Sequence, residues 1–503
     1  MRRIMTDRAR SRAWIVAILV LLALSAAYAL TLAPGLTWAN DGADGGDFAA
    51  AILTGGVPHP TGYPTYMLLG RLLTFVPMGD PAFELALMSA GLMALAGALL
   101  AFTLARELGS VSMAGVTAAA LAGIAFGLAP IPWSQAVIAE IHGLHACLLI
   151  AVVALVAELE RAQGPAKWMW LGLGLLSGLA LGNHLTFILL LPALALAVWW
   201  LRAADRRPVL LSGLGLLLGL LVYLYIPLAA SGKPPINWGG ASTWEGFAWL
   251  ISARPYQHLA FGLPLAEVPQ RIAALANLLL EQFGLLGISL AAVGLVYGGG
   301  RGRWPRALTY WIVPVYSVFA LGYNTADSTA YLIPAYLGVA WWIGLGVHRL
   351  LGAVRSWRVG WRGALIAALI AGVLAGVPAA ARQVDARHDQ RATNFWDEVQ
   401  ALAPIGAFVL THGTEDTFTL WYEHFGLGRR SDIRVIVVPL APYRWYRETV
   451  AATYTALNVP DPAAGDGSAW LTSLVQDNPG PICETDVTLN SADLPVAAID
   501  CGS

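Results

Sequence analysis

Three aspartates at a regular spacing make the segment 34–82 the part of the chain best equipped for chemistry. Asp41, Asp44 and Asp47 follow one another at intervals of three residues, with glycines between them. Carboxyl groups this close raise one another's pKa, so that one can act as a general base, or a pair can hold a divalent cation. The calcium-binding pattern of EF-hands is not matched. A solvated loop without chemistry is the plainer alternative.

Further polar residues follow in this segment and beyond it. His59 lies in the run His59-Pro-Thr-Gly-Tyr-Pro64, and Arg71 lies in the apolar stretch 66–76. That stretch is too short to span a membrane and is expected to be a helix in the interface. Each of these residues could simply cap an apolar helix, but together they would lie on one face of a membrane. The other candidates are His184, Lys233, Asn237, Trp238, Arg254 and Tyr256.

The composition shows that membrane helices must position these residues. Of the 503 residues, 57% are hydrophobic and 12% are charged, and the mean hydropathy is +0.63. A soluble domain carries about 25% charged residues. These values therefore exclude an ordinary soluble enzyme, a disordered chain and a nucleic-acid binder, and they predict a polytopic membrane protein.

Eleven apolar segments are candidates for membrane spans. With the N-terminus in the cytoplasm, 18 of the 22 Lys and Arg residues before residue 381 fall on the cytoplasmic side, as the positive-inside rule requires. The segment 168–201 is expected to form either two short helices or a hairpin that does not fully cross, and Gly174, Gly178 and Gly182 would let its helices approach neighbours closely. The segments are 13–33, 83–105, 111–129, 141–158, 168–182, 184–201, 208–229, 275–297, 307–323, 330–348 and 363–380.

The last 123 residues read as a separate unit. Residues 1–380 carry a net charge of +7 and residues 381–503 carry −8, and an odd number of spans places this acidic tail outside. The runs 394–402, 407–410 and 434–438 predict a helix and two strands of a small α/β domain. The loop 411–416 is expected to be a structural turn more than a ligand site. Cys483 and Cys501 could form a disulfide in an oxidising compartment, whereas Cys147 is expected to be an inert packing residue.

Several common motifs are absent from the sequence. It contains no GxGxxG between a strand and a helix, no phosphate-binding P-loop, no zinc-spaced His/Cys cluster and no Ser-centred hydrolase elbow. A transporter or flippase of lipid-linked sugars is the main alternative to an enzyme, but it predicts charged residues within spans and repeated broken helices. A non-catalytic scaffold would leave the acidic segment unexplained.

The acidic segment resembles a known family. The runs Asp44-Gly-Gly-Asp47-Phe and His59-Pro-Thr-Gly-Tyr-Pro64 are similar to a polytopic family long labelled as a domain of unknown function, which has bacterial members and is related to eukaryotic protein O-mannosyltransferases. The usual pattern there is W-D-S-G-E-F followed by H-P-P-G-x-P. This chain has Ala43 in place of the Trp and Asp47 in place of the Glu. Further agreement, in the same order, is found at 182–184, 225–227, 237–239, 410–422 and 429–432.

The resemblance implies a glycosyltransferase of the GT-C class. Such enzymes take a sugar from a polyprenyl-phosphate carrier and use an acid of the first outer loop, so no nucleotide fold and no cofactor is required. Asp44 would be the general base of an inverting transfer to a hydroxyl of a protein, lipid or glycan acceptor. Asp47 would orient the site or share the proton. A divalent metal is compatible with these acids but is not implied, because Asp41-x-x-Asp44 is not the usual D-x-D.

The resemblance also suggests which residues hold the substrates. His59 and His184 are expected to hold the phosphate or the sugar. The leaving phosphate needs cations to stabilise it, for which Arg254 and Lys233 are the first candidates and Arg71 the third. Asn237, Trp238 and Tyr256 complete the predicted substrate-binding set.

The sequence thus predicts two units in one membrane protein. The first, over residues 1–380, is an α-helical polytopic GT-C-like domain with about eleven transmembrane helices and a catalytic outer loop at 34–82. The second, over residues 381–503, is a small extracytoplasmic α/β domain. The expected location is a bacterial cytoplasmic membrane, with the N-terminus inside.

Overall fold

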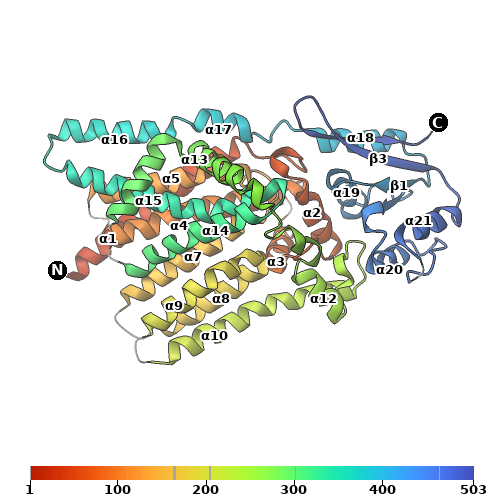
Figure 1. Cartoon of the computed structure of the whole chain (residues 1–503), viewed down its shortest axis with the longest axis horizontal. Coiled ribbons are helices and arrows are strands. Elements are labelled where there is room, and N and C mark those ends of the chain that lie inside the picture. The colour runs from red at the N-terminus through yellow and green to blue at the C-terminus, as the bar shows by residue number, and fades with distance from the viewer. Residues whose placement is uncertain are drawn as a thin grey trace.

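A computed structural model of the chain describes residues 2–76, 78–109, 112–162, 166–202, 205–298, 300, 302–463 and 465–502, and the side chains of residues 2–9, 326 and 327 are not described. A long helical bundle forms one end of the molecule and a small α/β unit forms the other (Figure 1). The N-terminus lies at the far end of the bundle, and the C-terminus lies in the α/β unit.

Helices lie at each of the eleven apolar segments, but the number of membrane crossings stays a prediction. Among the described residues, seven helices are long and apolar enough to cross a membrane, and two shorter apolar helices accompany them. The predicted fold, an integral membrane bundle followed by a small sheet domain, is confirmed. The bundle consists of α1 (Arg2–Ala29), α4 (Pro81–Leu108), α5 (Met113–Gly127), α7 (His142–Arg161), α8 (Lys167–Asn183), α9 (Leu191–Leu201), α10 (Arg207–Leu220), α13 (Val268–Tyr297), α14 (Arg303–Gly322), α15 (Ile333–Ala353), α16 (Val359–Leu374) and α17 (Val377–Val384).

Local sequence signals set the ends of these helices. Asp80 caps α4, because its carboxylate accepts hydrogen bonds from the backbone N–H groups of Ala82 and Phe83. Gly109 ends the same helix in the left-handed region at a φ of 68°, where glycine pays no steric cost. Ser112 caps α5 in the same way as Asp80 caps α4.

The segment 168–201 forms two short helices, and whether they cross the membrane fully or form a hairpin that does not stays open. Helix α8 ends at Asn183, and the short helix η2 (Leu185–Leu190) leads into α9. Gly174 and Gly178 pack directly on α10: a Cβ atom on Gly178 would lie 2.6 Å from the carbonyl oxygen of Leu216. The prediction that these glycines serve close helix packing is confirmed.

The segment 34–82 contains more helix than the sequence predicted. Besides α3 (Pro64–Leu73), which confirms the expected helix, it holds α2 (Asp44–Thr54), where only a loop was expected. Asp44 and Asp47 both lie in the first turn of α2, where the positive end of the helix dipole favours carboxylates. Short helices nearby are α6 (Pro130–Ser134), α11 (Tyr225–Ser231), α12 (Trp244–Ile251) and η5 (Arg254–Leu259).

The C-terminal unit is a four-stranded sheet in the order β2-β1-β3-β4. Strand β1 pairs in parallel with both β2 and β3, and β4 pairs antiparallel with β3. The expected helix and strands at 394–402, 407–410 and 434–438 are confirmed, whereas β3 and β4 were not predicted. The elements are α18 (Arg391–Leu402), β1 (Phe408–Thr411), α19 (Thr414–Leu420), β2 (Arg434–Val437), α20 (Arg444–Thr453), α21 (Gly467–Gln476), β3 (Ile482–Leu489) and β4 (Pro495–Asp500).

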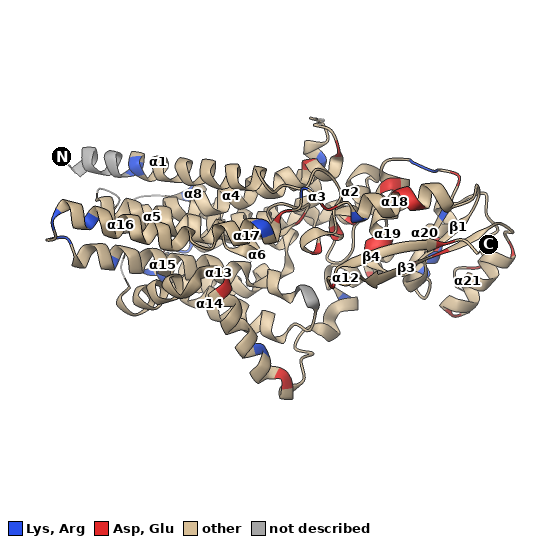
Figure 2. Ribbon diagram, turned by 90° about the horizontal axis from the view of Figure 1, so that it is seen from above, with Lys and Arg blue, Asp and Glu red and all other residues tan. Residues whose placement is uncertain are grey.

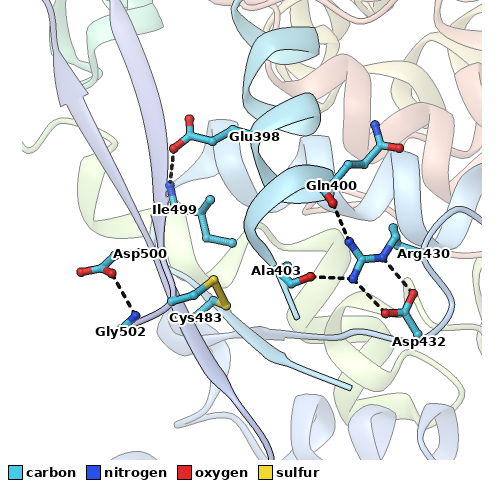
Figure 3. Close-up of a disulfide and its surroundings, with 10 residues drawn as sticks. Glu398, Gln400, Ala403, Arg430, Asp432, Cys483, Ile499, Asp500 and Gly502 are labelled. Atoms are coloured by element: carbon cyan, nitrogen blue, oxygen red, sulfur yellow. Dashed lines mark hydrogen bonds and ion pairs between the residues drawn. A yellow bond between two sulfur atoms is a disulfide. The ribbon is translucent and has the colours of Figure 1, made fainter. Parts of the chain in front are cut away.

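A disulfide joins Cys483 to Cys501 and ties the last two strands together (Figure 3). The bond that the sequence allowed is therefore present, and Cys147 is a buried free thiol as expected. The loop 411–416 is held by Asp416, whose buried carboxylate accepts hydrogen bonds from the backbone N–H groups of His412 and Gly413 and from the hydroxyl of Thr485. Thr414 of the same loop lines a cavity, so the expectation of a turn without a ligand stays a prediction.

Charge is unevenly distributed along the molecule. Lys and Arg residues lie in the loops at the end of the bundle near the N-terminus, while acidic residues are frequent around α18 (Figure 2). At the basic end, Glu158 forms ion pairs with Arg106 and Arg161. Among the basic residues expected in the cytoplasm, Arg301 and the side chains of Arg2, Arg3 and Arg8 lie outside the described part of the chain.

Candidate active site

Two cavities meet at the N-terminal end of α2. One has a volume of about 240 Å³ and is polar, and the other has a volume of about 500 Å³ and is lined largely by apolar side chains. Four residues line both of them, namely Asp44, Tyr63, His184 and Tyr331. The first-loop acid that the sequence favoured most therefore lies at the junction of two spaces of opposite character.

The polar cavity is rich in carboxylates and amides. Besides Asp44, the carboxylates of Asp41, Glu140 and Glu281 line it, together with His142. The amide side chains that line it are Asn40, Gln135, Gln282 and Gln383. Such a surface suits a ligand that offers many hydrogen-bond donors, as hydroxyl groups do.

The apolar cavity draws its walls from several distant parts of the chain. Leu185, Ile188 and Leu189 come from η2, and Phe319 comes from α14. Trp238 and Tyr256, both predicted to bind substrate, also line this cavity. Thr414 and Phe418 of α19 complete it, so the C-terminal unit contributes directly to the site. A wide apolar opening with polar groups at one end fits an amphipathic ligand.

Asp47 and His59 lie next to Asp44, and His59 itself lines the apolar cavity, as its predicted substrate-binding role requires. Asp47 is fully buried, and its Oδ2 atom lies 2.7 Å from Nδ1 of His59. His59 Nε2 lies 3.6 Å from Oδ2 of Asp44, whose side chain is 38% exposed. The imidazole of His59 therefore lies between the carboxylates of Asp44 and Asp47. Of these two aspartates, only Asp44 lines the cavities.

The C-terminal unit covers this cluster. The ring of Phe418 stacks on His59 with 6.0 Å between centroids, and Trp38 Nε1 donates a hydrogen bond to the hydroxyl of Thr419. Gly46 lies under α19 so closely that a Cβ atom there would lie 2.5 Å from the carbonyl oxygen of Phe418. The glycine is therefore needed for the contact between α2 and α19.

His184 belongs to a group of imidazoles at the wall between the cavities. Its ring centroid lies 5.6 Å from that of His142 and 4.8 Å from that of His145. The backbone N–H of Thr186 donates to Nδ1 of His184 at 3.3 Å. In the neutral ring the proton must then be on Nε2, which makes His184 a hydrogen-bond donor at that atom.

The three predicted cations lie away from the cavity walls. Among the described residues that line the two cavities, none is Lys or Arg. Arg71 is exposed at the end of α3, and Lys233 is exposed after α11. Arg254 is also exposed, but its neighbours Ala253 and Tyr256 line the apolar cavity, so it lies closest along the chain to the site. Their role toward a phosphate stays a prediction.

Several buried polar atoms near the site have no hydrogen-bond partner within the described structure. They include Oδ1 of Asp47, Asn183 and Asn237, and Nε1 of Trp238. Unsatisfied buried groups are rare in proteins and often mark functional sites. Asn237 itself does not line either cavity; it pairs with Val57 through an isolated bridge between backbones. Among the described His, Cys, Asp and Glu side chains, no group of three could hold a metal ion.

Sequence reasoning missed part of this site. Tyr63 belongs to the motif that starts at His59, and Phe418 belongs to the matching stretch 410–422, so a signal for both was present. Tyr331 and His142 carried a weaker signal, as aromatic and polar residues between apolar segments. His145 carried none, because it lies inside α7.

Comparison with known proteins confirms the resemblance seen in the sequence. Residues 44–207 match a family model described as the protein O-mannosyl-transferase TMEM260 N-terminal domain. Over 481 residues the chain is 24% identical to the mouse protein O-mannosyl-transferase TMEM260, and the match covers 88% of this chain. The chain spans 65% of the length of that relative.

Solved structures show the same fold. ArnT from Cupriavidus metallidurans, bound to undecaprenyl phosphate, superposes with a TM-score of 0.59 at 12% identity, covering 96% of this chain and 97% of ArnT. The oligosaccharyltransferase AglB from Archaeoglobus fulgidus, in complex with an inhibitory peptide and a dolichol-phosphate, gives a TM-score of 0.52 at 13% identity, covering 87% of this chain and 68% of AglB. The bundle and the small α/β unit therefore share the fold of these two structures, and the predicted GT-C-like fold class agrees with it.

Proposed function

We propose that this protein is a membrane glycosyltransferase that moves a sugar from a polyprenyl-phosphate carrier to a hydroxyl group of an acceptor, with Asp44 as the general base. The observation that carries this proposal is the position of Asp44, whose side chain lines both cavities where they meet. A base for this transfer must reach the acceptor and the sugar at once.

The two cavities suit the two substrates. The apolar cavity can take the first isoprene units and the phosphate of the donor, and the polar cavity can take the acceptor. The mouse relative is named as a protein O-mannosyl-transferase, and the two structural neighbours hold polyprenyl-type phosphates. These names support a lipid-linked donor and favour mannose as the sugar.

The proposed reaction is a single displacement. The carboxylate of Asp44 removes the proton from the acceptor hydroxyl while the hydroxyl oxygen attacks the anomeric carbon. The bond from that carbon to the phosphate oxygen breaks on the opposite face, which inverts the anomeric configuration and leaves the polyprenyl phosphate. Nε2–H of His184, at the cavity junction, is suited to donate to the phosphate oxygen as negative charge develops there.

Replacing Asp44 tests the proposal. Asp44→Asn keeps the size of the side chain but cannot accept the proton, so kcat should fall by about 10²–10⁴-fold. The measurement uses purified full-length protein in nanodiscs with polyprenyl-phosphate mannose and a Ser/Thr peptide, and it follows mannose transfer. Binding of the donor should be retained, because Asn preserves the volume at the junction.

Asp41→Asn is the matched comparison. Asp41 lines only the polar cavity, so its replacement should affect mainly the KM for the acceptor and should lower kcat far less than Asp44→Asn. Near-normal turnover of Asp44→Asn would exclude Asp44 as the base and, with it, this mechanism.

A further inference from the structure

Asp47 holds His59 by both its backbone and its ring. Asp47 Oδ2 accepts hydrogen bonds from the backbone N–H of His59 at 2.8 Å and from ring Nδ1 at 2.7 Å. The carboxylate is fully buried, and Oδ1 has no partner among the described residues. An ionised carboxylate removed from water needs a compensating charge. The ion pair recorded for Asp47 in the described structure is with His59.

The hydrogen bonds around His59 indicate two protons on its ring. Nδ1 faces a carboxylate oxygen, which can only accept, so Nδ1 donates. Nε2 lies 3.2 Å from the hydroxyl of Tyr63, whose single proton is donated to the carbonyl oxygen of Pro60 at 3.0 Å. With that proton so placed, Nε2 donates toward the Tyr63 oxygen, and it also faces a second carboxylate oxygen, Oδ2 of Asp44, at 3.6 Å. A ring with two donating nitrogens is an imidazolium.

The surrounding charges favour the same protonation state. Burial alone disfavours the charged ring, but the carboxylates of Asp44, Asp47 and Glu140 outweigh it and raise the pKa of His59 to about 9. The rings packed on His59 are uncharged and come from α2, the outer loops and α19; they belong to Phe48, Tyr63, Trp238 and Phe418.

We propose that His59 is a positioning residue, which the buried Asp47 keeps as a fixed cation and which in turn holds the Asp44 carboxylate ionised and aimed at the junction of the two cavities. This inference rests on the proposed function, because it assigns a role to the neighbours of its general base. Since His59 already carries both ring protons, it cannot receive the proton that Asp44 takes from the acceptor. That proton must return to water through the cavities.

The pH dependence of kcat tests this role. An opposite charge stabilises a carboxylate, so removing the His59 cation lets Asp44 become protonated at a higher pH. In His59→Gln, which keeps an amide donor, the acid side of the kcat profile should move to higher pH by about 1–3 units. The profile is measured between pH 4.5 and 9 on full-length protein in nanodiscs, with polyprenyl-phosphate mannose and a Ser/Thr peptide.

Three further variants make the test selective. Asp47→Asn combined with His59→Gln removes both charges of the buried pair, so it should fold well and show the same shift. Asp47→Asn alone should shift the acid side less, because His59 is still protonated at acid pH. His258→Gln makes the same substitution at an exposed position in η5 and should leave the profile unchanged.

Two results would overturn the inference. One is a set of profiles that coincide in folded variants, since His59 would then have no influence on the base. The other is complete loss of turnover at every pH in a folded His59→Gln variant that still binds the donor, since His59 would then take part in the chemistry itself. If Asp44→Asn remains active, the proposed function fails instead, so the two failures are distinguishable.

Discussion

The sequence motifs predicted which residues form the site, but not how these residues are arranged. Asp44, Asp47, His59 and His184 were expected near one another, and the structure brings them together at one end of α2. The order of these groups was not predictable. It depends on the loop 55–63, which folds back so that Asp47 binds both the backbone and the ring of His59. The sequence suggested two acids that repel each other, whereas the structure separates them by an imidazole.

The leaving phosphate offers a second test at the scale of residues. His184 lines both cavities, whereas Arg254 is exposed beside one of them. We therefore expect His184 to act in the chemical step and Arg254 to act in donor binding. His184→Ala should lower kcat by about 10²-fold, because a donor to the developing charge is lost. Arg254→Ala should raise the KM for the donor a few-fold at low salt and leave kcat nearly unchanged, because an exposed cation mainly attracts the anionic lipid.

Steady-state kinetics at two salt concentrations separate these effects. High salt should abolish the difference between Arg254→Ala and the unmodified protein, and it should not rescue His184→Ala. A large loss of kcat in Arg254→Ala would contradict this division and would give Arg254 direct contact with the phosphate in the transition state.

At the scale of elements, the contact between α2 and α19 decides whether the site is complete. The predicted division at residue 380 separates these helices, yet α19 supplies Thr414 and Phe418 to the apolar cavity. Their close approach depends on Gly46, which faces the backbone of Phe418. Hydropathy shows where the membrane helices end. It cannot show that α19, which comes after them in the chain, packs on α2 in the segment 34–82.

Gly46→Ala should therefore damage catalysis without damaging the bundle. A Cβ atom there would lie 2.5 Å and 2.8 Å from the carbonyl oxygen and carbon of Phe418, so α19 must move away from His59. We expect kcat to fall at least tenfold, by about 1.4 kcal/mol or more in the activation barrier, and limited proteolysis near residue 388 to become faster.

A glycine elsewhere provides the control for this variant. Gly91 lies within α4, and a Cβ atom on it would meet nothing within 4 Å. Gly91→Ala should keep full activity and the original proteolysis pattern, because alanine is the better helix former. If Gly46→Ala is as active as Gly91→Ala, the contact between α2 and α19 is not needed for the reaction.

At the scale of the whole molecule, hydropathy predicted the bundle well and the tail only in part. Long apolar runs can be stable only as buried or membrane helices, so the helices of the bundle were readily predicted. Strand β3 alternates buried and exposed residues and ends in exposed ones, so it lacks the continuous apolar run that identified β1 and β2. Strand β4 is apolar from Pro495 to Ile499, but proline and alanine are depleted in strands, so its sequence gives a weak strand signal. Helix α2 was missed because three glycines and three acids in a short segment are typical of a loop.

The orientation of the molecule in the membrane is the last prediction. Lys and Arg cluster at the end of the bundle that carries the N-terminus (Figure 2), and the positive-inside rule places that end in the cytoplasm. The opposite end carries the two cavities and the Cys483–Cys501 disulfide, which belongs in an oxidising compartment. Alkaline phosphatase, active only after export, should therefore be active when fused after residue 390 and inactive when fused near Arg303. The reverse pattern would place the two cavities on the cytoplasmic side. A lipid-linked donor would then have to present its sugar on the cytoplasmic leaflet, and the polar cavity could not take an extracytoplasmic acceptor.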